Sequence, residues 1–496
     1  MNLDQSKRIA YFSMEIGLDA SIPTYSGGLG VLAGDTLKSA ADLGFPVTGV
    51  TLLYRGGYMR QEIDEQGRQS ELPVNWRPEE KLTRTPHSFD ICIEGRRVKI
   101  NALCYSLRGA TGHVVPIYFL DCDLPVNEPR DRLLTGSLYG GDDTYRLSQE
   151  ILLGIGGVEL LSRIANSAGQ TLNDHFATFH MNEGHAALLT LGVIRASSTS
   201  PNGAKIAVAE TRARCAFTTH TPVPAGHDRF SAELAQRLIH PDYLGILNDH
   251  HLLKSGFLNM TEVAGVFSRV INGVTKRHAE VSQEMIKEMP AIASRSVIAI
   301  SNGVHATTWT TNSFKRLYDR EVPTWQNDPT NLRYIRDVNA DKIEVAHAEA
   351  QSELFQFIES RSGIKMRSDV FTLGFARRAA EYKRASLLFQ DIERLKGIAT
   401  GQSPLQVVFA GKAHPKDSGG KKLIEKVHLF AQQLKGSNIT VVYLPDYDMT
   451  LGRLICAGVD VWLNTPLKPL EASGTSGMKA ALNGVPSFSI LDGWWV

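Results

Sequence analysis

The residues best suited to carry out chemistry lie in the run 471–479, which has the sequence EASGTSGMK. Its serine, threonine and glycine residues offer hydroxyl groups and unhindered backbone N–H groups, which bind anions such as phosphate. The lysine at its end, Lys479, carries an amine that can form a Schiff base with an aldehyde. A phosphate cradle beside such a lysine is what pyridoxal phosphate needs. Small residues before a lysine also occur at ordinary helix starts, so this run alone leaves both interpretations open.

A second glycine-rich run, residues 26–30 with the sequence SGGLG, leads into a predicted helix. Gly28, Gly30 and Ala33 fit the dinucleotide-binding pattern G-x-G-x-x-A, but the next strand ends without the acidic residue that would hold an adenine ribose. A cradle of backbone N–H groups for an anion is therefore favoured over a dinucleotide site. A tight turn that serves only packing stays open.

A third run, residues 376–384, carries four cations directly after a predicted strand. From the end of that strand, Arg378 and Lys383 are in a position to reach an anionic ligand. The same density of charge is typical of a solvated helix face, so the run by itself does not decide between the two.

A fourth run, residues 180–185, reads HMNEGH and has the spacing H-x-x-E-x-H. This spacing places no two histidines at i and i+4, so it does not form the usual zinc-binding face of a helix. His220 and His227 add little to a metal interpretation. A polar loop that binds ligand hydroxyls is favoured, and no metal is expected. Glu183 and Glu471 have no spacing that would support a glycosidase pair of carboxylates.

Composition excludes several classes of protein. The chain has 496 residues, too many for one core, so two domains are expected. Lys and Arg number 53 against 52 Asp and Glu, which gives no charge excess for nucleic acid. The five cysteines are scattered and lack C-x-x-C spacing, which favours reduced thiols over disulfides or a zinc site. No segment is apolar enough for a signal peptide or a membrane span. A globular, cytoplasmic protein with no membrane partner is predicted.

Apolar runs and glycine punctuation predict an α/β chain. Residues 9–14, 31–43 and 47–53 form a strand–helix–strand unit, and segment 70–125 is a β-rich insertion expected to lie against the first sheet. Further strands of the N-terminal half are predicted at 177–180, 214–218 and 297–301. After a helix at 342–362, buried parallel strands are predicted at 371–375, 405–410, 439–444 and 459–464.

The expected domain boundary lies between residues 309 and 310. Residues 310–336 lack clear periodicity and are rich in Asn, Asp, Thr and Pro, so they are predicted to be the crossover between domains 1–309 and 310–496. Two α/β domains that face one cleft would bind ligands there. The chain stops at Val496 after two tryptophans and a strand-like segment, and we therefore expect a fragment with an incomplete second domain.

Together these runs resemble the α-glucan phosphorylase family, whose members act on glycogen, starch and maltodextrin. The resemblance spans the whole chain and rests on five motifs in the family's order. These are residues 9–13 with 25–35, residues 180–185, Asn302 and Gly303 with Trp309, residues 381–384, and residues 471–479. The first motif is similar to the shorter bacterial and archaeal branch. Five motifs in order, with suitable spacing, outweigh the alternative interpretation of each run.

The resemblance implies the fold of family B glycosyltransferases, with two Rossmann-like domains and pyridoxal 5′-phosphate in the cleft. It implies reversible, retaining transfer of the non-reducing-end glucosyl unit of an α-1,4-glucan to inorganic phosphate, which yields α-glucose 1-phosphate. The 5′-phosphate of the cofactor would shuttle the proton, since its second pKa lies near neutrality. A nucleotide-sugar glycogen synthase and an inactive glucan-binding fragment are the rival hypotheses, and a homo-oligomer stays open.

Residue by residue, the resemblance first assigns the cofactor site. Lys479 corresponds to the lysine that holds the cofactor, and Tyr447 lies near it. Arg377, Thr475 and Ser476 correspond to groups around the 5′-phosphate.

The substrate site follows from the same resemblance. Arg378 and Lys383, with the backbone around Gly28 and Leu29, correspond to the site of the substrate phosphate. His185 corresponds to a residue whose carbonyl and imidazole flank the glucosyl unit. The groups that hold the sugar hydroxyls correspond to Asn302, Glu471, Ser473 and Gly474.

Three features depart from the family pattern. The long N-terminal extension that carries phosphorylation and nucleotide control in animal members has no counterpart, because the signature begins at Ile9, so this allosteric control is not expected. Gly477 stands where many members have Asn. Family members also continue well past the segment 492–495.

Overall fold

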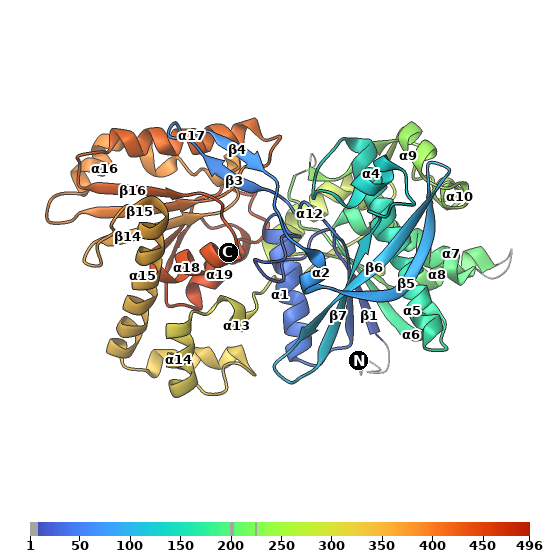
Figure 1. Ribbon diagram of the computed structural model, residues 1–496, viewed down its shortest axis with the longest axis horizontal. Coiled ribbons are helices and arrows are strands. Elements are labelled where there is room, and N and C mark those ends of the chain that lie inside the picture. Colours follow the sequence, from blue (N-terminus) through green and yellow to red (C-terminus); the bar gives the residue numbers. More distant parts are fainter. Residues whose placement is uncertain (1–7, 199–202, 224–225) are drawn as a thin grey trace. The chain divides into compact units, whose positions relative to one another are not determined.

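The computed structural model describes residues 8–198, 203–223 and 226–496 and divides the chain into two compact units (Figure 1). Unit 1 consists of Met1–Tyr58 and Val74–Asn302, and unit 2 consists of Met59–Pro73 and Gly303–Val496. Each unit is built on a largely parallel sheet with flanking helices. This confirms the predicted α/β fold class, which is that of family B glycosyltransferases.

Unit 1 contains a nine-stranded sheet and a small two-stranded sheet. The strands of the large sheet are β1 (Arg8–Phe12), β2 (Val47–Leu52), β5 (Thr83–Ile93), β6 (Arg96–Arg108), β7 (Val114–Asp121), β8 (Phe176–Asn182), β9 (Cys215–Thr218), β12 (Val270–Gly273) and β13 (Val297–Ala299). The small sheet pairs β10 (Arg229–Ser231) with β11 (Phe257–Asn259).

The order of the large sheet is β13-β12-β9-β8-β1-β2-β7-β6-β5. All pairs from β13 to β7 are parallel, whereas β6 and β5 pair antiparallel at one edge. The prediction that segment 70–125 packs against this sheet is wrong. Because β7 pairs directly with β2, its strands extend the sheet itself.

Helices pack on both faces of this sheet, because successive side chains of a buried strand point to opposite sides. On β1, Phe12 belongs to one apolar cluster and Tyr11 to another. The helices of unit 1 are α1 (Gly28–Asp42), α2 (Pro78–Lys81), α3 (Pro129–Arg132), α4 (Asp143–Ile151), α5 (Gly157–Ser167), α6 (Leu172–His175), α7 (Leu189–Ser197), α8 (Gly203–Arg214), α9 (Ala232–Leu238), α10 (Pro241–Asp249), α11 (Met260–Val266) and α12 (Lys276–Lys287).

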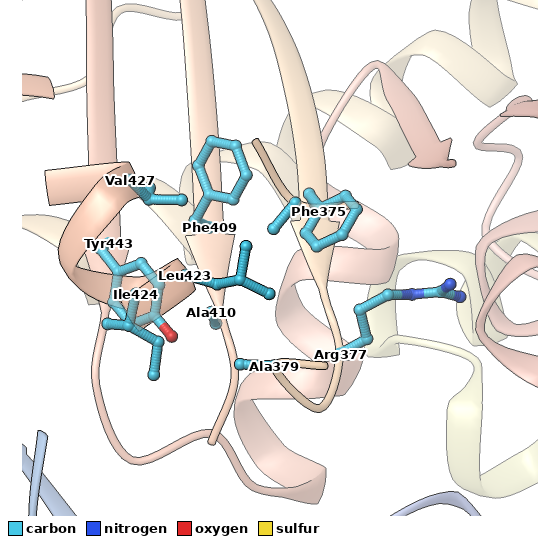
Figure 2. Close-up of a pocket in the computed structure, with 10 residues that line it drawn as sticks. Phe375, Arg377, Ala379, Phe409, Ala410, Leu423, Ile424, Val427 and Tyr443 are labelled. Atoms are coloured by element: carbon cyan, nitrogen blue, oxygen red, sulfur yellow. The ribbon is translucent and has the colours of Figure 1, made fainter. Parts of the chain in front are cut away.

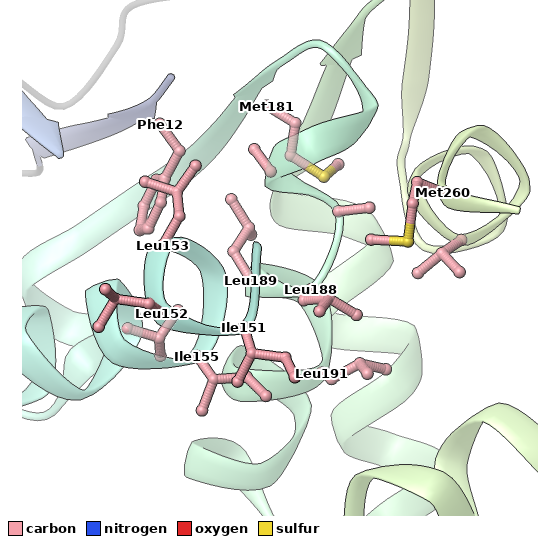
Figure 3. Packing of buried hydrophobic residues seen from close by; sticks show 14 of the residues in the cluster. Phe12, Ile151, Leu152, Leu153, Ile155, Met181, Leu188, Leu189, Leu191 and Met260 are labelled. Carbon is pink, nitrogen blue, oxygen red and sulfur yellow. The ribbon is translucent and has the colours of Figure 1, made fainter. Parts of the chain in front are cut away.

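The larger apolar cluster joins β1 to a central helical layer (Figure 3). Between α4 and α5 the chain continues as a π-helical segment, Leu152–Gly156. Glycine is required where this layer meets the sheet, since a Cβ at Gly157 would lie 2.4 Å from Cε1 of Phe12. This close contact fixes the carboxyl end of β1, from which a candidate site begins.

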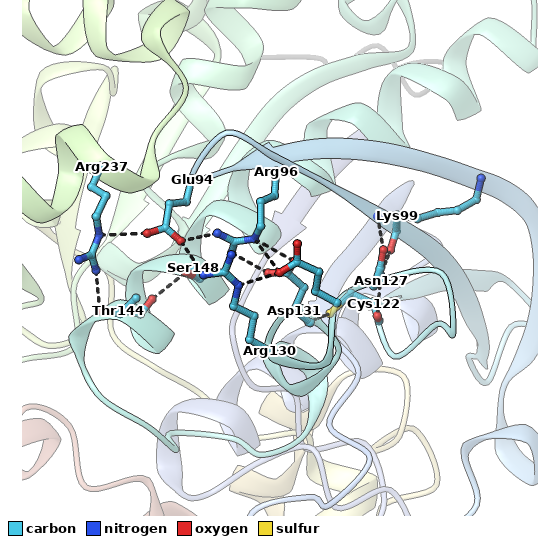
Figure 4. Close-up of polar contacts among 11 residues, drawn as sticks. Glu94, Arg96, Lys99, Cys122, Asn127, Arg130, Asp131, Thr144, Ser148 and Arg237 are labelled. Atoms are coloured by element: carbon cyan, nitrogen blue, oxygen red, sulfur yellow. Dashed lines mark hydrogen bonds and ion pairs between the residues drawn. The ribbon is translucent and has the colours of Figure 1, made fainter.

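A polar network holds the β5–β6 hairpin against neighbouring helices of unit 1 (Figure 4). Arg96 donates from Nη2 to Oδ1 of the buried Asp131 at 2.8 Å and also pairs with Glu94. Arg130 and Arg237 pair with the same Glu94 carboxylate, at 3.2 and 3.3 Å. Because these arginines are paired with carboxylates, the network stabilises the hairpin and is not a candidate anion site.

Unit 2 contains a five-stranded parallel sheet with the order β16-β15-β14-β17-β18 and a hairpin of β3 (Arg60–Ile63) and β4 (Gln69–Leu72). The strands of the sheet are β14 (Phe371–Ala376), β15 (Leu405–Ala410), β16 (Ile439–Leu444), β17 (Val461–Asn464) and β18 (Ser487–Ser489). Apolar runs on both faces fill two clusters, with Val408 in one and Phe409 in the other.

Residues 310–336, in which the sequence shows no clear periodicity, are largely helical. This segment carries α14 (Asn312–Glu321) and a 3₁₀ helix, Pro329–Asp337, which follow α13 (Ala306–Trp309). Few apolar residues of α14 are buried, among them Phe314, Leu317 and Tyr318. The helical period of these residues is therefore difficult to recognise among the many polar residues of the segment. The other helices are α15 (Ala340–Ser362), α16 (Ile392–Ile398), α17 (Ser418–Gln433), α18 (Met449–Gly458) and α19 (Thr475–Ala481).

Among the residues that the structure describes, no helix has the length and apolar character needed to span a bilayer. The five cysteines are free thiols.

Candidate active site

The strand order of unit 2 reverses at β14. The chain runs outward from β14 to β15 and β16, and then returns to β17 and β18 on the other side. In open parallel sheets, ligands bind beyond the carboxyl ends of the strands at such a switch point. Arg377 follows β14 directly, and the loop that contains Glu471 follows β17. The topology thus brings together two runs that sequence analysis selected separately.

A buried carboxylate lies between two cations at this point. Glu471, 5% exposed, accepts from Arg377 Nη1 at 2.9 Å and from Lys383 Nζ at 2.6 Å. Burial alone would raise the pKa of the Glu471 carboxyl, but the charges of Lys383 and Arg377 outweigh it and hold the pKa at about 2. Glu471 is therefore ionised at neutral pH and pairs with cations that the resemblance assigns to phosphate groups.

The stability that Glu471 contributes is expected to disappear in acid. Its carboxyl binds a proton more weakly in the folded chain than in the unfolded chain, so its contribution is present above about pH 4.3 and is lost as the pH falls toward 2. The full effect is about 3 kcal/mol, because one pKa unit corresponds to 1.36 kcal/mol. Urea unfolding at a series of pH values should give a flatter profile for Glu471→Gln than for the parent chain. Parallel profiles would contradict the assignment.

The loop 471–479 is held by its small residues. Gly474 has a φ of 85°, which side chains rarely allow. A Cβ at Gly477 would lie 3.1 Å from Ser487 Oγ and 3.2 Å from the ring of Trp494, so this position is crowded. The Ser476 hydroxyl accepts from Arg377 Nη2 at 3.1 Å and from Trp462 Nε1 at 3.2 Å. Arg377 thus bridges the two ends of the loop.

Lys479 lies on α19 in a buried, aromatic environment. The side chain is mostly buried, and its Nζ lies 3.5 Å from the centroid of the Trp309 ring. Asn483 fixes this pair, because its Nδ2 donates to the carbonyl oxygens of Lys479 and Trp309, both at 2.9 Å. A cation on the face of tryptophan gains about 0.5–2 kcal/mol. The structure therefore holds this amine in one place.

Two further polar atoms of this region are suited to a ligand. Ser473 Oγ and Arg377 Nε are buried and have no hydrogen-bond partner among the described residues. The Arg377 Nε, the Lys479 amine and the Ser476 hydroxyl form a donor set that fits a group carrying an aldehyde and a phosphate, and Ser473 Oγ is left to bind another polar group.

The remaining predicted residues of unit 2 lie around this cluster. Thr475 is the first residue of α19, and Tyr447 packs on the apolar cluster beneath β14. Arg378 is exposed. The pKa of His414 is lowered first by the burial of its ring and second by the charge of Arg378. A small cavity nearby is lined mostly by apolar side chains, and the Arg377 guanidinium points away from it (Figure 2). The cavity is therefore not the anion site.

Unit 1 has its own switch point, between β1 and β8. Beyond β1, the Glu15 carboxylate accepts from the backbone N–H of Ser26 at 2.6 Å and from that of Gly27 at 3.3 Å. Burial raises the pKa of Glu15 more than these hydrogen bonds lower it. The anion cradle predicted at 26–30 thus binds an internal carboxylate. Gly28 and Leu29 begin α1 beside it.

His185 has a structural contact that the sequence did not indicate. Its Nε2 accepts from the backbone N–H of Met14 at 2.9 Å, and its side chain is fully buried. Burial, with the nearby Arg146 charge, lowers the pKa of His185 to about 3, so the ring is neutral at physiological pH. The imidazole supports the segment after β1, and its Nε2 is already occupied.

His220 and Asn302 also follow strands of unit 1. His220 lies just beyond β9, where its Nε2 is 2.7 Å from Asn182 Oδ1 and its backbone N–H donates to Glu183. Asn302 follows β13, and its N–H donates to the carbonyl of Val274. In the sequence, His220 stood out only as a possible metal ligand. Its position at a strand end makes it a further candidate for ligand contact.

The role of Asp492 is visible only in the structure. Its buried carboxylate accepts from the backbone N–H of Glu471 at 2.9 Å. The next residue, Gly493, has a φ of 62°, and the N–H of Trp494 donates to the carbonyl of Ser473 at 2.9 Å. Asp-Gly after an apolar strand signals a tight turn. The partner of that turn could not be read from local sequence.

Comparison with known proteins agrees with the resemblance. The family model of carbohydrate phosphorylases matches residues 16–103 and 245–496. Maltodextrin phosphorylase of Thermococcus litoralis is 38% identical over 98% of this chain and 61% of its own length. Glycogen phosphorylase of Mycobacterium tuberculosis is 38% identical over 98% of this chain and 60% of its own length, and that of Aquifex aeolicus is 34% identical over 99% and 74%. The chain therefore spans about three fifths of the first two relatives.

Proposed function

Because the chain belongs to the carbohydrate phosphorylase family, we propose that it is an α-1,4-glucan phosphorylase. It transfers the non-reducing-end glucosyl unit of an α-1,4-glucan reversibly to inorganic phosphate, with retention, and yields α-glucose 1-phosphate. The observation that supports this most strongly is the buried cluster of Arg377, Lys383 and Glu471 at the switch point of unit 2. Its two cations follow one strand end and lie beside a loop that ends in a buried amine.

The proposed cofactor is pyridoxal 5′-phosphate. Lys479, Tyr447, Arg377, Thr475 and Ser476 would hold it. Support comes from the buried amine, from the hydrogen bond between Arg377 and Ser476, and from the unpartnered Nε of Arg377. When bound, the group supplies a phosphate whose second pKa near neutrality lets it exchange a proton with the reacting phosphate.

In this proposal the cations of unit 2 lower the cost of bringing two phosphates together, which repel strongly where water is excluded. Arg378 and Lys383 bind the substrate phosphate. Since Lys383 is paired with Glu471 in this structure, it must exchange the carboxylate for a phosphate oxygen. The exchange frees the Glu471 carboxylate to accept a hydrogen bond from a hydroxyl group of the sugar.

In unit 2, sugar recognition uses Ser473, Gly474 and Glu471. The unpartnered hydroxyl of Ser473 supports its assignment, because a sugar hydroxyl would satisfy it. For His185, the contact of its ring with Met14 favours the backbone carbonyl as the group that stabilises the positive charge developing on the sugar.

Phosphate release from glucose 1-phosphate tests the proposed function. With a maltooligosaccharide primer and pyridoxal phosphate, the chain is expected to release inorganic phosphate and to lengthen the primer by glucosyl units. The same mixture with a nucleotide sugar in place of glucose 1-phosphate should yield no elongation. Elongation only with the nucleotide sugar would identify a synthase. No turnover by a folded, cofactor-loaded chain would identify a glucan-binding protein and refute the proposal.

A further inference from the structure

The hairpin β3–β4 comes from the N-terminal part of the chain but packs within unit 2 (Figure 1). Its turn lies against α17, where a Cβ at Gly67 would lie 2.7 Å from His428, and Gln432 donates to the carbonyl of Glu65. Lys421 at the start of α17 pairs with Glu71 at 2.7 Å. The hairpin is thus fixed to α17, and Gln61 of β3 and Gln69 of β4 contact the loop that follows β15.

Gln61 on β3 makes hydrogen bonds through its side-chain amide and its backbone N–H. It is 2% exposed, and its Nε2 donates to Gly411 O at 2.9 Å and to Gln69 Oε1 at 2.8 Å. Its Oε1 accepts from the backbone N–H of Asp446 at 2.8 Å, and its own N–H donates to Asp446 Oδ1 at 3.0 Å. A buried amide with all these groups satisfied specifies one geometry, because any shift leaves a polar group unpaired.

One partner of Gln61 leads to the cation-bearing segment. Gly411 runs so close to β14 that a Cβ there would lie 2.0 Å from the carbonyl oxygen of Arg377. The next residue, Lys412, accepts from the N–H of Ala379 at 2.9 Å. Gln69 holds Ala413 through paired hydrogen bonds of 2.9 and 3.0 Å. The loop 411–413 therefore links the hairpin to the backbone on both sides of Arg378.

The other partner leads to Tyr447. Asp446 has a φ of 59°, a conformation that costs a residue other than glycine about 1–3 kcal/mol unless its surroundings hold it. Gln61 binds both its N–H and its carboxylate, and Lys412 pairs with the same carboxylate at 2.6 Å. These contacts fix the backbone from which the Tyr447 side chain departs.

We propose that Gln61 is a positioning residue for the phosphate-binding and cofactor-binding loops of unit 2, an inference that rests on the proposed function. Through Gly411 it sets the backbone of Arg377 and Arg378. Through Asp446 it sets the direction of Tyr447. It touches neither substrate nor cofactor itself, and its amide acts only through the two loops.

The test compares Gln61→Met, which keeps the volume but loses the hydrogen bonds of the amide, with Glu62→Gln in the full chain. Glu62 is the next residue on the same strand. Among the described residues, its only ion pair is the exposed one with Arg60. For Gln61→Met, the KM for inorganic phosphate should rise roughly tenfold and pyridoxal phosphate should dissociate faster, while the KM for the glucan changes less than about twofold. Glu62→Gln should match the parent chain in all three.

Hydrogen exchange of backbone amides gives a readout that does not depend on activity. In Gln61→Met the segments 377–379, 411–413 and 446–447 should exchange faster, while β16 and the apolar core keep their protection. Unchanged exchange in these segments overturns the inference, whether or not the chain is a phosphorylase. A lower melting temperature of Gln61→Met with an unchanged KM for phosphate also overturns the inference. A parent chain without phosphorolysis would instead refute the proposed function.

Gln69→Met separates the two arms and guards against a Gln61 variant that does not fold, because Gln69 is only half-buried. It removes the contacts with Ala413 and the hydrogen bond that Gln61 donates to Gln69, but leaves the hydrogen bonds between Gln61 and Asp446 and the one from Gln61 to Gly411. It should raise the KM for phosphate with little effect on release of pyridoxal phosphate. Equal effects on both properties would contradict separate positioning of the two loops.

Discussion

Lys479→Ala is expected to abolish retention of pyridoxal phosphate and phosphorolysis together, with a loss of activity of at least ~10³-fold. The amine is held in one place by Trp309 and by the Asn483 bridge, and no other lysine lies in the run 471–479. Absorbance of the bound cofactor and its fixation to protein by borohydride report retention, and phosphate release reports activity. Full turnover by this variant without added cofactor would show that the assignment of Lys479 is wrong.

Lys479→Arg is the matched control for charge. It keeps a cation near the face of Trp309 but cannot react with an aldehyde. We expect it to unfold at nearly the parent temperature and to be as inactive as Lys479→Ala. An active Lys479→Arg would indicate that the residue contributes only charge.

Glu471→Ala is expected to have the largest effect on stability. It leaves Lys383 and Arg377 buried without their carboxylate, and breaking a buried ion pair in this way costs about 3–5 kcal/mol. The free energy of unfolding, measured with urea at neutral pH, reports this loss. Phosphorolysis should also fall, because the same carboxylate is proposed to bind the sugar.

Inorganic phosphate should restore part of the stability lost in Glu471→Ala. An anion that binds the two cations takes the place of the missing carboxylate, and a ligand that binds only the folded state stabilises it by RT ln(1 + L/Kd), where L is the concentration of free ligand. The melting temperature should therefore rise more with phosphate for Glu471→Ala than for the parent chain, while chloride at equal ionic strength serves as the control. An equal rise for both proteins would contradict the view that Glu471 and phosphate compete for the same cations.

The predicted strands of unit 2 agree closely with the structure, and the physical reason is local. Residues 405–410 and 439–444 are short apolar runs bounded by turn residues, and they form β15 and β16 with these same limits. Buried parallel strands need such runs because both of their faces are covered. Helix α14 was missed because only one narrow stripe of it is buried, and its many polar residues resemble those of a loop.

The candidate site was predicted as a set of residues and not as an arrangement. Arg377, Lys383 and Glu471 were predicted from the sequence as site residues, but as groups for different ligands. The structure pairs Glu471 with the two cations, which lie 94 and 88 residues away in the chain. For His185 it shows a neutral, buried ring that binds the Met14 amide. A charge or an imidazole does not carry the identity of its partner in local sequence.

The sequence by itself determined the α/β class, the family and the residues able to do chemistry, because these depend on apolar runs, glycine positions and motifs that are each local. Only the tertiary structure decided which loops meet. The order of the strands places the ends of β14 and β17 side by side, and the docking of β3–β4 brings Gln61 to Gly411 and Asp446, 350 and 385 residues away. Long-range contacts of this kind follow from sheet order and from satisfying buried polar groups, and neither has a period along the chain.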